Sequence, residues 1–116
     1  MVLREKTFGF ACDVVNAYKE ITSIHKEYVL SKQFLKSGTA PGALVREAEY
    51  AQSKPDFISK LSIALKEANE CGYWIDLLRD GGFISDSDSG ELLAANKEII
   101  YMLVASIKTS KANNQK

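Results

Sequence analysis

Histidine is almost absent from this sequence, because His25 is the only one among 116 residues. A di-iron helical bundle needs Glu-x-x-His pairs on two helices, and the residue three positions before His25 is Thr22. Cys12 lies thirteen residues earlier on the same expected helix, too far away to form a Cys-His catalytic pair with it. Phosphate-binding loops and zinc motifs are also missing. We therefore expect no enzymatic activity, no metal and no cofactor, and we interpret His25 as an exposed residue at a helix C-terminus.

Cysteine is also scarce, with only Cys12 and Cys71. Two cysteines are too few for a disulfide framework or a zinc site. Both fall on apolar faces of expected helices. We therefore expect two buried, reduced thiols.

The chain lacks an excess of charge, since 15 Lys and Arg balance 15 Asp and Glu. A neutral protein has no overall field that attracts nucleic acid or an anionic membrane, and nothing in its net charge keeps its copies apart. It also lacks an apolar run approaching about 20 residues, and its N-terminus does not resemble a signal peptide. We expect a cytoplasmic protein with no membrane partner.

What the sequence does contain is helical periodicity, clearest between Ser53 and Ile84. Ser53 and Asp56 have the spacing of a capping box at a helix start, and Gly81-Gly82 supplies a left-handed stop. Between them, apolar residues recur in alternating steps of four and three, the seam of a helix that packs on other helices. This seam comprises Phe57, Leu61, Ala64, Ala68, Cys71, Ile75 and Leu78.

The same periodicity occurs in three other segments, and no strand-like alternation is present. In the first, the seam comprises Leu3, Thr7, Phe10, Val14, Ala17, Ile21, Ile24 and Tyr28. Four such segments joined by short turns predict an all-α, up-down-up-down antiparallel four-helix bundle in a single domain, residues 1–116. The expected helices are roughly 3–28, 29–52, 54–80 and 86–109, followed by a frayed tail at 110–116.

The second segment is interrupted by the run from Ser37 to Ala43, which contains Gly38, Pro41 and Gly42. Proline removes a helical hydrogen bond and each glycine destabilises a helix by about 1 kcal/mol. Because the heptad phase survives the interruption, we favour one helix kinked near Gly38–Gly42 over two short helices. The small residues either permit a tight helix crossing or form a notch for a ligand, and we favour the crossing.

A second apolar stripe lies off the seam of the third helix. Ile63, Trp74 and Leu77 point about 100–160° away from the seam, and Tyr73 lies beyond them. This stripe is either the side of a wide face that contacts two neighbouring helices or a subunit interface, where Trp and Tyr are favoured. Zero net charge favours the interface, so these four residues are the candidate oligomer contacts.

Basic residues gather on the second helix and just after it. Lys32, Lys36, Arg46 and Lys54 are weak candidates for contacts with RNA, or alternatively an ordinary solvent-exposed face. Acidic residues Glu67 and Glu70 lie three apart on the third helix. Glu47 and Glu49 lie on the adjacent second helix. Paired carboxylates can bind a cation or act as acid and base, but we expect these four acidic residues to form ion pairs with Arg46, Lys60 and Lys66 instead.

Several strings resemble the bacterial four-helix bundle proteins, also called the 23S rRNA intervening-sequence protein family, whose members sometimes carry a ribosomal-protein label. The resemblance is strong over residues 38–84, and bundle patterning continues on both sides. The strings are GTAPGALVREA at 38–48, SKPDF at 53–57, KLSIALKEANE at 60–70, YWI at 73–75 and GFI at 82–84. The chain departs from the family pattern at Pro41, usually aliphatic, and at Leu44, usually Asn.

This resemblance implies a small antiparallel bundle without enzymatic activity that assembles into a ring, typically a homopentamer. Some relatives are encoded within insertions in rRNA genes. A more distant, basic relative is the accessory protein of diversity-generating retroelements, which binds a reverse transcriptase and RNA. The resemblance thus implies an oligomeric scaffold, and alternatively an RNA- or nucleoprotein-binding accessory module.

Overall fold

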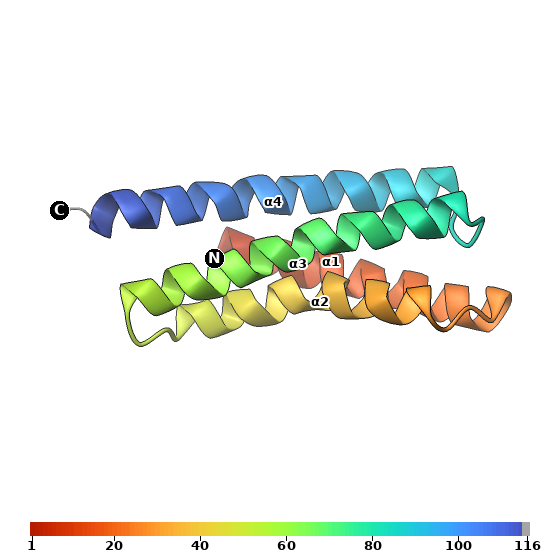
Figure 1. Ribbon diagram of the computed structural model, residues 1–116, viewed down its shortest axis with the longest axis horizontal. Helices are drawn as coiled ribbons and strands as arrows, with labels where there is room; N and C mark the ends of the chain where they lie inside the picture. Colours follow the sequence, from red (N-terminus) through yellow and green to blue (C-terminus); the bar gives the residue numbers. More distant parts are fainter. Residues whose placement is uncertain (115–116) are drawn as a thin grey trace.

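The computed structural model describes residues 1–114, which form four long helices and no strand (Figure 1). The expected all-α, four-helix fold is therefore confirmed. The chain turns back at each connection, so neighbouring helices run antiparallel. The elements are α1 (Val2–Glu20), the short π-helix η1 (Ile21–His25), α2 (Leu30–Glu49), α3 (Lys54–Asp80) and α4 (Asp86–Asn114).

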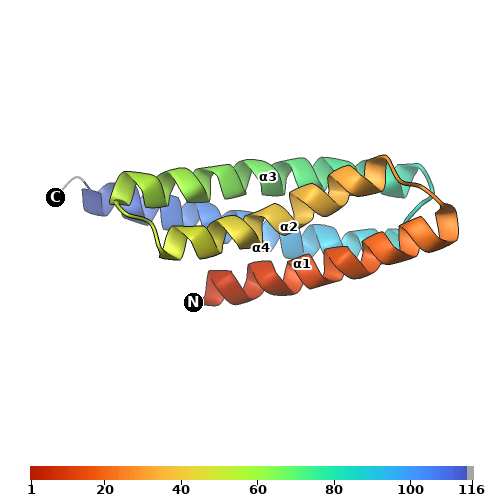
Figure 2. The same ribbon diagram turned by 90° about the horizontal axis from the view of Figure 1, so that it is seen from below.

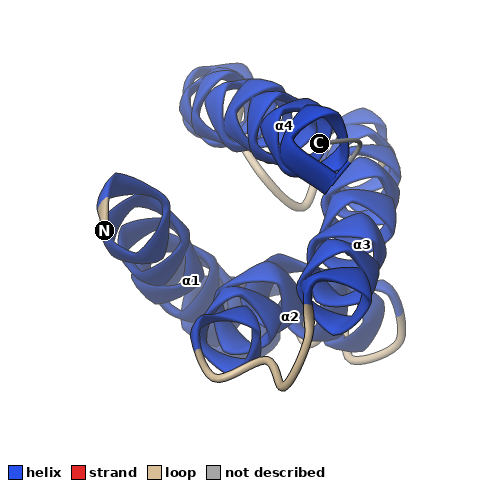
Figure 3. Cartoon of the chain, turned by 90° about the vertical axis from the view of Figure 1, so that its left-hand side faces the viewer, coloured by secondary structure: helices blue, strands red, loops and turns tan. Residues whose placement is uncertain are grey.

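Successive helices follow one another around an arc, with α1 and α4 at its two ends (Figure 3). The α2–α3 contact is the most extensive, and the α1–α4 contact is the slightest of the four helix–helix contacts. The resulting bundle measures 52 × 21 × 20 Å. Within residues 1–114, no helix is both long enough and apolar enough to cross a membrane.

The expected signals at both ends of α3 are present. The Ser53 hydroxyl oxygen accepts a 3.1 Å hydrogen bond from the Asp56 N–H. The Asp56 carboxylate in turn accepts one from the Gln52 N–H. At the other end Gly82 is left-handed, with φ of +82°. The Phe83 N–H donates to the Leu78 carbonyl at 2.9 Å, which completes a Schellman stop.

The first helix ends earlier than the predicted residue 28. Lys26 adopts a left-handed conformation with φ of 55°, and this breaks the helix after η1. Glu27 then caps α2, because its carboxylate accepts hydrogen bonds from the Val29, Leu30 and Ser31 N–H groups. The expected seam residues near this break, Ile24 and Tyr28, are exposed as a result.

The fourth helix begins at the predicted residue, Asp86, but continues past the predicted end at residue 109. The Ser85 hydroxyl oxygen accepts a 3.0 Å hydrogen bond from the Asp88 N–H and so caps the start of α4. The predicted frayed tail at 110–116 is wrong for residues 110–114, which are helical. Lys111 lies in the last turn, where a cation stabilises the carbonyl end of a helix. Residues 115 and 116 lie outside the described part of the chain.

The interrupted segment forms a single helix, α2, with Pro41 in its interior. The kink at this proline stays a prediction. The small residues mark a close approach to α1: a Cβ added at Gly38 would lie 2.7 Å from Cγ2 of Val14, and one at Gly42 would lie 3.4 Å from the Thr7 carbonyl oxygen. Both distances support the tight helix crossing.

Gly38→Ala is therefore expected to lower the free energy of unfolding by about 1–3 kcal/mol, the usual effect of overpacking. The overpacking cost is high because Val14 is fully buried and has a stiff side chain. The higher helix propensity of alanine offsets only about 1 kcal/mol of that cost. Gly9→Ala is the matched control, because its added Cβ meets no atom within 4 Å and should stabilise α1. Urea unfolding of both variants is the measurement, and equal stabilisation of the two would contradict the tight crossing.

The core follows the predicted seams closely. Every seam residue of α3 is fully buried except Phe57, which is half-buried. The other helices add further apolar side chains to the same cluster. The largest of these with almost no exposed surface are Phe34, Ile21, Ile99, Leu103, Val14 and Val45.

Candidate functional site

The apolar stripe of α3 is partly exposed and partly packed against its own bundle. Ile63 and Tyr73 are 44% and 57% exposed. Trp74 and Leu77 are half-buried, and Trp74 packs against the core. The Tyr73 and Trp74 rings contact each other edge to face, with centroids 5.1 Å apart. Trp74 is therefore covered in part by its own bundle, whereas Ile63 and Tyr73 face outward, and the subunit interface stays a prediction.

Polar atoms lie within this stripe as well. The Trp74 indole N–H donates a 3.2 Å hydrogen bond to the Glu70 carboxylate, which holds the ring along the helix surface. Ile63, Glu70 and Leu77 recur every seven residues, so they lie on one side of α3. We define the α3 stripe as Ile63, Tyr73, Trp74 and Leu77.

The predicted basic residues only partly come together. Lys32, Lys36 and Arg46 lie within a sector of about 80° on α2, at 100° per residue. The Arg46 guanidinium lies 5.2 Å from the centre of the exposed Phe8 ring, a cation–π contact. Neither lysine forms an ion pair with any residue of 1–114. Lys54 lies on the next helix and is exposed.

The expected ion pairs of the acidic residues on α2 and α3 form only in part within the described residues. Lys60 pairs with Glu47 at 3.4 Å, as predicted, since both lie where α2 meets α3. Glu67 and Glu70 form no ion pair within residues 1–114. Arg46 is engaged with Phe8, and Glu70 accepts the Trp74 hydrogen bond. No group of three or more His, Cys, Asp or Glu in residues 1–114 is arranged to hold a metal ion.

The two thiols differ, and the expectation that both are buried is wrong for Cys12. Cys12 is exposed, because it lies about 160° around α1 from the buried Val14. Cys71 is buried in the seam of α3. Burial raises the pKa of the Cys71 thiol to about 12, and a hydrogen bond with Ser37 acts in the opposite direction. Cys71 therefore stays a neutral thiol in the folded protein.

The raised pKa of Cys71 predicts a loss of stability in alkali. The unfolded chain releases this proton above about pH 9, whereas the folded chain keeps it until about pH 12. The free energy of unfolding should therefore fall as pH rises between these values, by up to about 1.4 kcal/mol per pH unit. Chemical denaturation from pH 8 to 11 tests this, with Cys71→Ala as the comparison. An identical pH dependence in the two proteins would contradict it.

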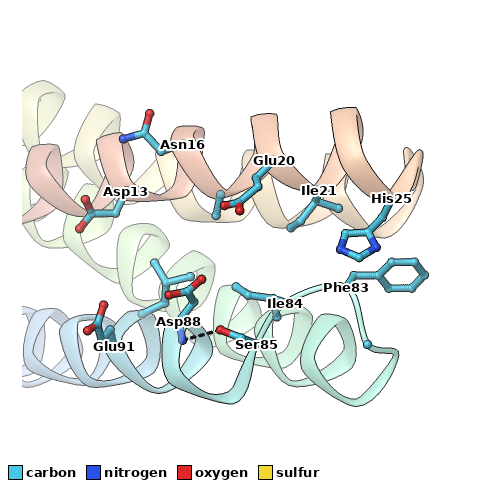
Figure 4. Close-up of a pocket in the computed structure, with 13 residues that line it drawn as sticks. Asp13, Asn16, Glu20, Ile21, His25, Phe83, Ile84, Ser85, Asp88 and Glu91 are labelled. Carbon is cyan, nitrogen blue, oxygen red and sulfur yellow. Dashed lines mark hydrogen bonds between the residues drawn. The ribbon is translucent and has the colours of Figure 1, made fainter.

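Two adjoining hollows, not foreseen from the sequence, lie between α1 and α4. The larger has a volume of about 570 Å³ and the smaller about 300 Å³, and Asp13 lines both. Carboxylates from both helices face the larger hollow, with Ile21 and Ile84 between them (Figure 4). At its far end His25 contacts Phe83 edge to face, with ring centroids 5.7 Å apart. We call the two hollows together the α1–α4 groove.

The carboxylates of the groove come from regular positions on the two helices. The full set is Glu5, Asp13 and Glu20 on α1 with Asp88, Glu91 and Glu98 on α4. Lys6 also lines the groove, and its ammonium pairs with Glu98 at 2.9 Å. Spacings of seven or eight on α1, and of three and seven on α4, are the sequence signal that could have found this acidic lining.

Known proteins with this fold are similar over nearly the whole chain. A crystal structure of a protein with unknown function from the S23 ribosomal protein family of Bacteroides thetaiotaomicron has a TM-score of 0.90 and 46% sequence identity. The similarity covers 91% of this chain and 98% of that one. No curated protein matches the sequence. A family model described as 23S rRNA-intervening sequence protein matches residues 1–105. The chain therefore belongs to the 23S rRNA-intervening sequence protein family.

Proposed function

We propose that this protein is a non-catalytic scaffold that assembles with copies of itself through the α3 stripe. The observation that carries the proposal is the outward exposure of Ile63 and Tyr73 beside the half-buried Trp74. Large apolar and aromatic side chains in one exposed row are typical of protein–protein contacts. A net charge of zero offers no general repulsion between copies.

The assembly that we propose is a cytoplasmic ring, a homopentamer. The resemblance to the family implies this number of copies. A ring requires that each copy present two different surfaces, so that a head-to-tail contact repeats and closes. In this arrangement the α3 stripe of one copy meets another face of the next, and Tyr73 and Trp74 supply the central aromatic contact.

Substitution of the exposed residues is expected to dissociate the assembly while the bundle stays folded. Ile63→Asp combined with Tyr73→Ser should reduce the mass measured by light scattering to that of one chain, because the apolar contact between copies is lost. The bundle should stay folded, because both side chains are exposed and contribute little to core packing. Trp74→Ala and Leu77→Glu are also expected to dissociate it, but Trp74→Ala also removes packing from the core.

Tyr101→Ser is the matched control, since this tyrosine is 67% exposed on another helix. Circular dichroism should show the same helix content for all variants. If the double variant kept the mass of the parent protein, the α3 stripe would not be the contact.

A second candidate function is RNA or nucleoprotein binding through α2. The favouring observation is the sector of Lys32, Lys36 and Arg46, where Arg46 overlies an aromatic ring and the lysines have no ion-pair partner in residues 1–114. Basic side chains beside an exposed aromatic ring suit a phosphate backbone and an unstacked base. The family description, which refers to 23S rRNA, is compatible with this function.

RNA binding would show a steep dependence on salt. Lys32→Glu combined with Lys36→Glu should weaken retention of an rRNA fragment and reduce the salt slope by about one for each lost phosphate contact. Lys97→Glu combined with Lys108→Glu, on exposed positions of α4, makes the same change in net charge as a control. Equal retention by both double variants would rule out α2 as the RNA surface.

A further inference from the structure

The α1–α4 groove is the least closed part of the bundle. Helices α1 and α4 make the slightest of its helix–helix contacts, and both hollows lie between them. The lining runs along α1 and η1 from Val2 to His25, which at about 1.5 Å per residue is about 35 Å. This length equals about six turns of a helix. The groove is therefore long enough to receive an extended or helical segment.

The floor of the groove is apolar. Ala17 and Ile84 are half-buried there, beside the nearly buried Ile21 and Leu92. Phe83 closes one end, where its ring contacts His25. A hollow of about 570 Å³ has the size of a typical small-molecule pocket and accommodates a few large side chains. The floor therefore suits apolar side chains as anchors.

The two edges of the groove are acidic. Among the lining residues, six carboxylates face a single lysine, Lys6, and that lysine is already paired with Glu98. Asp13, Glu20, Asp88 and Glu91 form no ion pair within residues 1–114. The chain as a whole is neutral, so this acidic lining is a local segregation of charge, opposite in sign to the Lys32–Lys36–Arg46 sector of α2. Phosphate groups are repelled from such a groove, whereas Lys and Arg side chains are attracted.

We propose that the α1–α4 groove docks a basic amphipathic helix of a partner protein. Its apolar side chains enter the larger hollow, and its Lys and Arg side chains pair with the carboxylates on the edges. The mode is a helix in a groove, with apolar anchors every three or four residues. Charge complementarity favours this occupant over a nucleic acid, and the apolar floor favours it over a small cation.

The test uses an 18-residue fluorescent peptide composed of Leu and Lys in a helical amphipathic pattern, with the same peptide carrying Glu for Lys as its counterpart. Fluorescence anisotropy at about 50 mM salt should show saturable binding of the basic peptide only. Asp13→Asn combined with Glu91→Gln should weaken this binding about tenfold or more, because two charge contacts are lost. The difference should shrink at about 500 mM salt.

The matched control is Glu67→Gln combined with Asp76→Asn, which changes the net charge equally on α3, outside the groove. Equal weakening by the control and the groove variant would overturn the proposal, as would binding of the acidic peptide. Spermidine that bound as tightly as the peptide would show a site for small cations instead. A change in oligomeric mass in the groove variant would show that a second copy fills the groove, and would also overturn the proposal. If the α3-stripe variants lost self-assembly but still bound the peptide, the groove would be confirmed as a docking site separate from the self-assembly surface.

Discussion

Asn96→Asp is expected to lower the free energy of unfolding by about 3 kcal/mol or more at neutral pH, since it places an unpaired charge in the core. Asn96 is 3% exposed, and its side-chain N–H donates a 2.8 Å hydrogen bond to the Ala68 carbonyl oxygen of α3. Its Oδ1 atom has no hydrogen-bond partner in the described residues. The substitution replaces the donor with a second negative oxygen facing that carbonyl. It therefore removes the hydrogen bond that links α4 to α3 and adds repulsion.

The loss of stability caused by Asn96→Asp should depend on pH and should be smaller at low pH. Burial raises the pKa of the introduced carboxyl above its unfolded value, so the folded variant binds a proton more readily than the unfolded one. Its stability should therefore recover as pH falls, and the protonated carboxyl can then donate to Ala68. Urea unfolding between pH 4 and 8 measures this.

Two controls separate charge from shape. Asn96→Leu keeps a branched side chain of similar size and removes the unpartnered oxygen, so it should change stability by less than about 1.5 kcal/mol. Asn69→Asp makes the same chemical change at an exposed position of α3 and should have little effect. An Asn96→Asp variant as stable as the parent protein at pH 7 would show that water or a rearrangement reaches this site.

Phe34→Ala should destabilise the protein by about 3–5 kcal/mol, the usual range for a deleted core aromatic ring. Phe34 is fully buried and is the largest side chain without exposed surface. It belongs to α2, which lies between α1 and α3 and contacts both, so the cavity would lie inside the best-packed part of the bundle. The denaturation midpoint in urea is the readout.

Phe8→Ala is the matched control for this loss, because the Phe8 ring is 54% exposed. Its removal deletes only surface packing and the contact with Arg46, so the expected effect is about 1 kcal/mol or less. A similar loss for both phenylalanines would contradict the assignment of Phe34 to the core.

Much of the fold is predictable from the sequence because each helix has a strong local signature. The seam of α3 recurs without a break, and its buried residues from Leu61 to Leu78 are those of the predicted seam. Its start at Ser53 and its stop at Gly82 depend on side-chain caps and backbone freedom, which are local effects. Such signals do not need tertiary information.

The errors occur where periodicity continues beyond the helix that it describes. Ile24 and Tyr28 keep the heptad spacing, yet the left-handed Lys26 ends the helix before Tyr28. Glu27 falls within the predicted first helix, 3–28, but it is the cap of α2. Cys12 was also predicted to be buried, but it lies about 160° around α1 from the buried Val14 and is exposed.

The candidate sites were predictable only in part. The α3 stripe can be found by rotation about a helix axis, but whether Trp74 is covered by its own bundle depends on the packing of neighbouring helices. The α1–α4 groove was missed because heptad patterns do not determine which pair of helices packs least closely. Its carboxylates, such as Asp13 and Glu91, are far apart in sequence and meet only in the folded bundle.

The most direct test of self-assembly is the mass of the parent protein in solution. Light scattering at micromolar concentration should give a single species several times the 12.8 kDa mass of one chain, and five times that mass for the proposed ring. A single species of 12.8 kDa under these conditions would contradict the proposal that this bundle functions as an oligomeric scaffold.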